Sequence, residues 1–232
     1  MSGISSVGPT VFWSAATLGF YFLSKRAHRR FRAEWAAPLV LAPILLIAMT
    51  LMLHKTYDDY IHETKWLVSF VGPCTVAFAI PIWEHRALIR RYWPVLIVSV
   101  VVGSATSMLS ARILARLLGL DQEVVLSLMP RSMSTPFALA VSRTFGGNAD
   151  LTAFFVVVTA VFGAAVGELM LTLLPVRSVI SRGALFGMGA HGAGVTRAHQ
   201  LGHEEGSIAG VVMVLVGIFN VLVAPWVRHL VR

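Results

Sequence analysis

Residues 94–118 read PVLIVSVVVGSATSMLSARILARLL, an apolar run with two charges near its end. A helix needs about 20 mostly apolar residues to cross the hydrocarbon of a bilayer, so this run predicts a membrane-spanning helix. Arg112 and Arg116 stand about one helical turn apart, and we expect their side chains to extend to the membrane surface.

Comparable runs occur along the whole chain of 232 residues, of which 56% are hydrophobic and 13% charged. Soluble domains carry about 25% charged residues, so the composition favours a multi-pass membrane protein. Including 94–118, eight membrane segments are expected in one all-α transmembrane domain that covers residues 1–232. The other clear runs are 7–23, 35–53, 66–83, 151–174 and 208–227, and two interrupted ones are 124–145 and 183–201.

The net charge of +8 comes from short basic clusters between apolar runs. That pattern is typical of cytoplasmic membrane loops and not of a nucleic-acid-binding face. The cluster at residues 25–32 predicts a cytoplasmic first loop and an external N-terminus. The single cysteine, Cys74, lies in an apolar run, where we expect it to pack; it excludes an internal disulfide.

The topology of the second half has two solutions. If segments 124–145 and 151–174 each cross once, Arg177 and Arg182 fall outside, against the positive-inside rule. If 124–145 enters and turns back, both arginines become cytoplasmic, and residues 121–232 form an inverted copy of residues 1–120. Inverted repeats with broken helices are a common plan among transporters.

Residues 71–81, VGPCTVAFAIP, form the first of three segments that break the pattern of a plain membrane helix. Pro73 and Pro81 each remove a backbone donor, and the carbonyls that they release must find partners within the membrane. The segment is either a packed helix with two kinks or an unwound stretch that lines a site, in which case Thr75 faces the approach.

The second broken segment is 127–136, SLMPRSMSTP, which places an arginine and several hydroxyls between Pro130 and Pro136. A charge at the bilayer centre costs about 2.5 kcal/mol or more, so such residues usually face a cavity or a partner. Pro136 can begin a helix with Thr135 as its cap. Helix N-termini bind anions, and an arginine fork suits a carboxylate. The candidate anion ligands are Arg131, Ser132, Ser134 and Thr135. The alternative is a polar interfacial loop from which the arginine reaches the surface.

The third broken segment, 187–197, reads GMGAHGAGVTR. Its glycines, with breaks expected at Gly189, Gly192 and Gly194, permit close approach of a backbone or a ligand. His191 can titrate near neutral pH or donate to a substrate, and with Thr196 it could complete the pocket. A packing role for the histidine is the alternative.

Other charged residues have simpler interpretations. Glu168 lies in an apolar run and either pairs with an arginine or, like His191, carries protons for coupling. A cluster after residue 198 resembles metal ligands but is better explained as a solvated loop: His199, His203, Glu204 and Glu205. No serine has a base positioned to activate it, so no enzymatic activity, metal or cofactor is expected.

The three broken segments also carry a family resemblance. From about residue 66 to residue 227, the chain resembles the LrgB/CidB family of bacterial membrane proteins. The matching motifs are residues 72–81, 127–136, 146–147 with 151–153, 190–194, 196–198 and 205–206. The chain departs from the family pattern at three positions: Arg131 replaces a lysine, Ala190 a serine, and Val195 part of a Gly-Thr pair.

The resemblance implies two functions. Family members are described as antiholin-like effectors of murein hydrolases that act with a smaller LrgA/CidA membrane partner, and plastid relatives resemble glycolate/glycerate translocators. We therefore expect a bacterial inner-membrane carrier of small carboxylates such as glycolate, glycerate, lactate or pyruvate, linked to control of autolysis. The alternative is a holin-like regulator that assembles in the membrane, as a homo-oligomer or with its partner, without a transported substrate.

Overall fold

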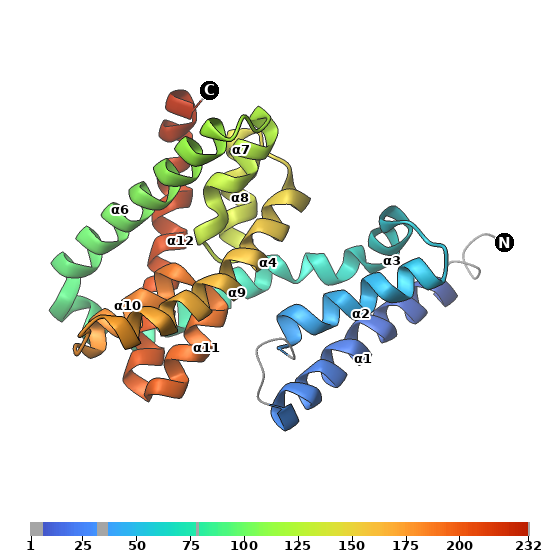
Figure 1. The fold of residues 1–232 in the computed structure, drawn as a ribbon, viewed down its shortest axis with the longest axis horizontal. Helices are drawn as coiled ribbons and strands as arrows, with labels where there is room; N and C mark the ends of the chain where they lie inside the picture. The colour runs from blue at the N-terminus through green and yellow to red at the C-terminus, as the bar shows by residue number, and fades with distance from the viewer. Residues whose placement is uncertain (1–6, 32–36, 78, 232) are drawn as a thin grey trace. The chain divides into compact units, whose positions relative to one another are not determined.

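The computed structural model describes residues 7–31, 37–77 and 79–231, and the described residues are helices joined by short connections (Figure 1). The chain forms two compact units, Met1–Cys74 and Thr75–Arg232.

The N-terminal unit contains α1 (Val7–Phe31), α2 (Pro38–Met52) and α3 (Tyr57–Ser69), with α2 and α3 both packed on α1 (Figure 1). The Trp66 indole nitrogen donates to Ser14 Oγ at 2.8 Å, which joins α3 to α1. A capping box begins α3, where Thr56 and Asp59 exchange hydrogen bonds. The bonds from Thr56 lower the pKa of the Asp59 carboxyl.

The second unit is organised around its C-terminal helix. Its elements, in chain order, are the end of α4 (Val71–Ala77), α5 (Ala79–Glu84), α6 (Arg86–Leu117), α7 (Gln122–Leu128), the 3₁₀-helix η2 (Met129–Ser132), α8 (Thr135–Phe145), α9 (Ala149–Leu173), α10 (Val179–Gly189), α11 (His191–Leu201) and α12 (His203–Val231). Helix α12 packs against α6, α8, α10 and α11. Its valines at 212, 214 and 216 join the aromatic rings of Phe137 and Phe145 in the main core.

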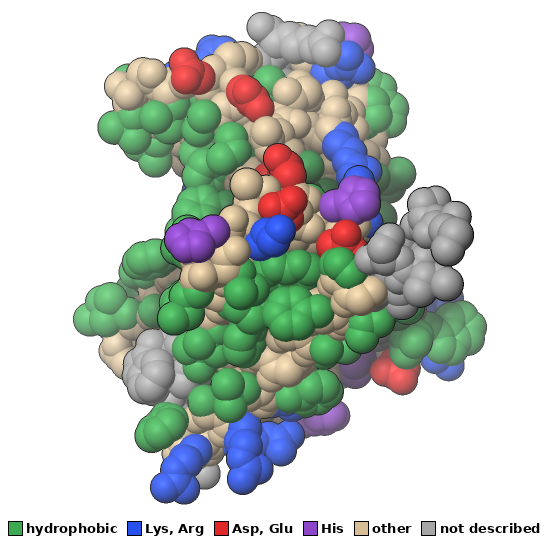
Figure 2. Space-filling view, turned by 90° about the vertical axis from the view of Figure 1, so that its right-hand side faces the viewer, with side chains coloured by type: hydrophobic (Ala, Val, Ile, Leu, Met, Phe, Trp, Pro, Cys, Tyr) green, Lys and Arg blue, Asp and Glu red, His purple; other side chains and the backbone are tan. Residues whose placement is uncertain are grey.

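The surface confirms a helical membrane protein. On α6, large apolar side chains such as Val98, Val102 and Ile113 are exposed along much of its length. Figure 2 shows broad areas of apolar side chain, with charged side chains gathered in separate groups. Apolar patches of this extent are not stable against water and indicate contact with lipid.

The expected number of spans was wrong. In the described part of the chain, three helices, α6, α9 and α12, are long and apolar enough to cross a membrane, whereas eight segments were expected. Helix α2 has 15 residues, about 22 Å at 1.5 Å each, which is short for a hydrocarbon core of about 30 Å. The two interrupted segments divide into short helices, because proline and glycine end each helix within a few turns.

Candidate functional site

Helix α7, η2 and α8 form a hairpin, so residues 124–145 turn back on themselves rather than run straight. The chain returns at Asn148, whose backbone N–H donates to Ser127 Oγ at 2.8 Å and whose Nδ2 donates to Glu123 Oε1 at 3.1 Å. Gly146, with φ of +89°, ends α8 in the left-handed conformation that favours glycine. The tip of this first hairpin is the stretch from Met129 to Thr135.

A buried hydroxyl cluster holds the two arms of this hairpin to α9. Thr152 Oγ1 donates to Ser142 Oγ at 2.7 Å and also lies 3.1 Å from Ser127 O. Asn148 caps α9 by accepting from Asp150 N at 2.9 Å and Leu151 N at 3.2 Å. These bonds fix the base of the hairpin and therefore the position of its tip.

Helices α10 and α11 form a second hairpin. Ala190 ends α10 with a φ of −138°, and His191 begins α11 with a φ of +39°. The return is so tight that a Cβ on Gly194 would lie 2.0 Å from Phe186 O, so only glycine fits at that crossing. The tip of this second hairpin is the turn from Gly189 to His191.

The two tips meet. His191 is 2% exposed, and its Nε2 lies 3.0 Å from the carbonyl oxygen of Arg131. A carbonyl can only accept, so Nε2 carries the proton and donates it. The bond joins two residues that are 60 positions apart in sequence. We call the two tips together, residues 129–135 and 189–191, the junction.

The junction offers groups that suit an anion. Helix α8 begins there, with Ser134 as its cap, one residue earlier than the Thr135 cap expected from the sequence. Phe137 N and Ala138 N both donate to Ser134 O at 3.0 Å. The Ser134 hydroxyl is buried, with 8% of the residue exposed, and has no hydrogen-bond partner among the described residues. A free hydroxyl at the positive end of a helix is a group that an anion could satisfy.

Arg131 supplies the positive charge. Its side chain is half-buried, and Nη1 donates to Ser132 Oγ at 3.1 Å. No carboxylate among the described residues forms an ion pair with it. A guanidinium at this depth without a carboxylate partner suits a bound carboxylate.

Three polar residues that were not predicted as site residues lie beside the junction. Ser107 in α6 donates to Ser132 Oγ at 2.5 Å, and Asn220 in α12 donates to Ser104 Oγ at 2.8 Å. With Ser132, these side chains line a cavity of about 10 Å³, room for a single water molecule. Asn220 is a lone amide in an apolar run, which is the signal that could have identified it.

The remaining predicted residues lie elsewhere. Thr196 is exposed and donates to Gly192 O at 3.1 Å in its own helix. Glu168 pairs with Arg197, and its side chain is 51% exposed. The side chains of Thr75 and Pro81 lie outside the described residues. Pro73 and Pro81 stand in the first turns of α4 and α5, where a missing N–H is tolerated, while Gly192 and Gly194 lie inside α11.

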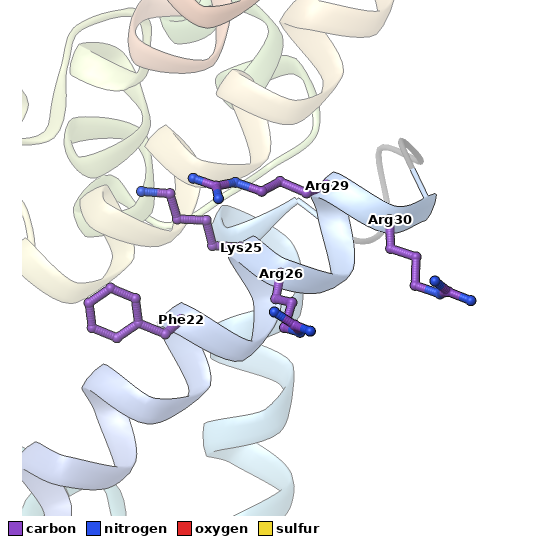
Figure 3. Close-up of a pocket in the computed structure, with 5 residues that line it drawn as sticks. All are labelled: Phe22, Lys25, Arg26, Arg29 and Arg30. Carbon is purple, nitrogen blue, oxygen red and sulfur yellow. The ribbon is translucent and has the colours of Figure 1, made fainter.

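A group of exposed basic side chains lies outside the junction. Figure 3 shows the basic end of α1, where the exposed side chains of Lys25, Arg26, Arg29 and Arg30 follow Phe22 along the helix. Such a cluster suits the headgroup region of a membrane. Within residues 7–31, 37–77 and 79–231, no group of three His, Cys, Asp or Glu side chains could hold a metal ion.

Comparison with known proteins confirms the family resemblance seen in the sequence. The model of the LrgB-like family matches residues 17–230, which include every residue of the junction. The chain belongs to the LrgB-like family. An uncharacterized Bacillus subtilis protein, YwbG, is 34% identical over 210 residues, 90% of this chain and 93% of YwbG. The antiholin-like protein LrgB of Bacillus subtilis is 35% identical over 188 residues, 81% of each chain.

This LrgB-like chain is also similar to YxaC of Bacillus subtilis, an uncharacterized protein that is 29% identical over 92% of this chain and 94% of YxaC. No solved structure matches it.

Proposed function

We propose that this LrgB-like protein carries small organic anions, of the glycolate, glycerate, lactate and pyruvate type, across the bacterial inner membrane. The observation that carries the proposal is the buried, unpartnered Ser134 hydroxyl at the start of α8, three residues after an arginine that has no carboxylate partner among the described residues. In the proposed complex, Arg131 holds the carboxylate by its fork, and Ser134 and Thr135 donate from the helix N-terminus. His191 positions the loop that carries Arg131 by donating a hydrogen bond to the Arg131 backbone carbonyl.

The arrangement of the hairpins supports a carrier over a fixed binding protein. Two hairpins whose tips meet between longer helices resemble the broken helices from which transporters build their sites. The cavity of about 10 Å³ that Ser132 lines is too small for a whole acid of this kind, so binding of one there requires the lining side chains to move apart. Of the two candidate proton carriers, only His191 lies at the junction, so we place proton coupling there.

The names of the relatives favour a second candidate. Several are called antiholin-like protein LrgB, which suggests control of cell lysis through murein hydrolases, with an LrgA/CidA-like membrane partner. A regulator of that kind acts by assembly and needs no saturable substrate site.

Uptake into proteoliposomes separates the two functions. The purified chain is reconstituted, and initial rates are measured against concentration for glycolate, glycerate, lactate and pyruvate. A carrier gives saturable uptake of at least one acid with no leak of a trapped dye. Dye release, or no saturable uptake by protein that remains folded, would refute the carrier and favour the regulator.

A further inference from the structure

The polar residues beside the junction form a second, neutral site. Asn220 is 4% exposed and Ser104 is 5% exposed, both in otherwise apolar helices. Asn220 Nδ2 donates to Ser104 Oγ at 2.8 Å and to Val216 O at 2.7 Å. Both bonds use the amide nitrogen, so they leave the amide oxygen, Oδ1, available as an acceptor at the cavity.

Ser132 connects this site to the proposed anion site. Its Oγ accepts from Ser107 Oγ at 2.5 Å and from Arg131 Nη1 at 3.1 Å. An oxygen that already accepts twice has its own hydrogen left to donate. The hydroxyl of Ser132 can therefore donate into the cavity while the same oxygen contacts the guanidinium that would hold a carboxylate.

The size and lining of the cavity restrict what enters it. Its volume of about 10 Å³ admits one oxygen atom. The wall is completed by flexible thioether side chains, from Met108, Met129, Met133 and Met188. Such a wall adapts to a small aliphatic group but provides no hydrogen bonds of comparable strength.

The hydrogen-bond donors and acceptors of the cavity determine which ligand group fits it. The cavity offers hydroxyl donors from Ser104 and Ser132 and an acceptor from Asn220 Oδ1. A hydroxyl group both accepts and donates, so it satisfies both kinds of partner. A carbonyl oxygen only accepts and would leave Oδ1 buried without a donor, which is unfavourable.

We propose that this cavity binds the 2-hydroxyl group of a hydroxy acid and that Asn220 selects hydroxy acids over 2-oxo acids. The inference rests on the proposed function, because the carboxylate of the same molecule is held by Arg131. It assigns specificity to α6 and α12, helices that contribute none of the residues predicted from the sequence.

The test compares matched acids in proteoliposomes: lactate with pyruvate, and glycolate with glyoxylate. The wild-type chain should take up each hydroxy acid with an efficiency at least about tenfold that of its oxo partner. Asn220→Leu, which keeps the branched shape but loses the acceptor, should make the two efficiencies nearly equal. The control is Ser110→Ala on α6, the helix that carries Ser104, since Ser110 donates to the Ser107 carbonyl at 3.1 Å and does not line the cavity. It should keep the wild-type ratio.

A double variant distinguishes loss of the hydroxy-acid preference from misfolding. Ser104→Ala with Asn220→Leu removes both partners of the buried bond and leaves neither unsatisfied, so it should fold and also lose the preference. Flux with no hydroxy preference in the wild type, or with a ratio unchanged in the variants, would refute this inference alone. Absence of saturable flux for all four acids would refute the proposed function and the inference with it.

Discussion

A methyl group added at Gly163 should displace the tip of the second hairpin without changing any polar side chain. Gly163 lies in α9 against the turn of the second hairpin, and a Cβ there would lie 2.2 Å from Gly189 O and 3.2 Å from Ala190 Cβ. Close C···O contacts are about 3.3 Å, so Gly163→Ala requires a shift of about 1 Å between α9 and the turn. A shift of about 1 Å in a binding group can cost about 100-fold in rate, and overpacking costs about 1–3 kcal/mol of stability.

A second helical glycine supplies the control. A Cβ on Gly210 in α12 would have no heavy atom within 4 Å. Gly210→Ala should therefore be neutral or should stabilise the helix by up to about 1 kcal/mol. The two variants are compared by thermal unfolding in detergent and by initial uptake rate. If Gly163→Ala unfolds and transports like Gly210→Ala, the contact between α9 and the second tip is not as described.

Three further predictions concern the hairpins and the topology. His191→Phe leaves the Arg131 carbonyl without its donor and should cost about 1–3 kcal/mol in thermal unfolding, together with most of the uptake; stability equal to wild type would contradict the bond. Asn148→Ala removes the cap of α9 and should lower the free energy of unfolding by about 1 kcal/mol; an unchanged unfolding midpoint would argue against the cap. In a Cys74→Ser background, Ser178→Cys should react only with membrane-permeant thiol reagents if the second half is inverted, and labelling from outside would exclude that topology.

The three long helices could be predicted because each is a continuous apolar run. Residues 94–118, 151–174 and 208–227 correspond to α6, α9 and α12. For residues 124–145 the sequence allowed either a single crossing or a segment that turns back. The hairpin is the second of these, and it turns at Pro130 and Pro136, which interrupt a helix. The position of the turn in the second hairpin could not be predicted. The sequence offers Gly189, Gly192 and Gly194 equally, and only Gly189 adjoins the break between α10 and α11.

Contacts between residues distant in sequence could not be predicted. Ser104 and Asn220 are 116 residues apart, and no local pattern connects them. Glu168 seemed deep in an apolar run, yet it lies five residues from the end of α9 and pairs with Arg197. The contact between His191 and the Arg131 carbonyl likewise depends on how two hairpins pack, which periodicity does not specify.

Arg131 is the residue on which the proposed carrier depends most directly. The decisive measurement is the initial rate of saturable carboxylate uptake by proteoliposomes that contain wild-type, Arg131→Lys, Arg131→Ala or, as a control, Arg143→Ala protein. Arg143 is an exposed arginine in the last turn of α8. We expect Arg131→Ala to abolish uptake, Arg131→Lys to retain part of it because the charge remains without the fork, and Arg143→Ala to match wild type. Full uptake by folded Arg131→Ala protein would contradict the proposed anion site.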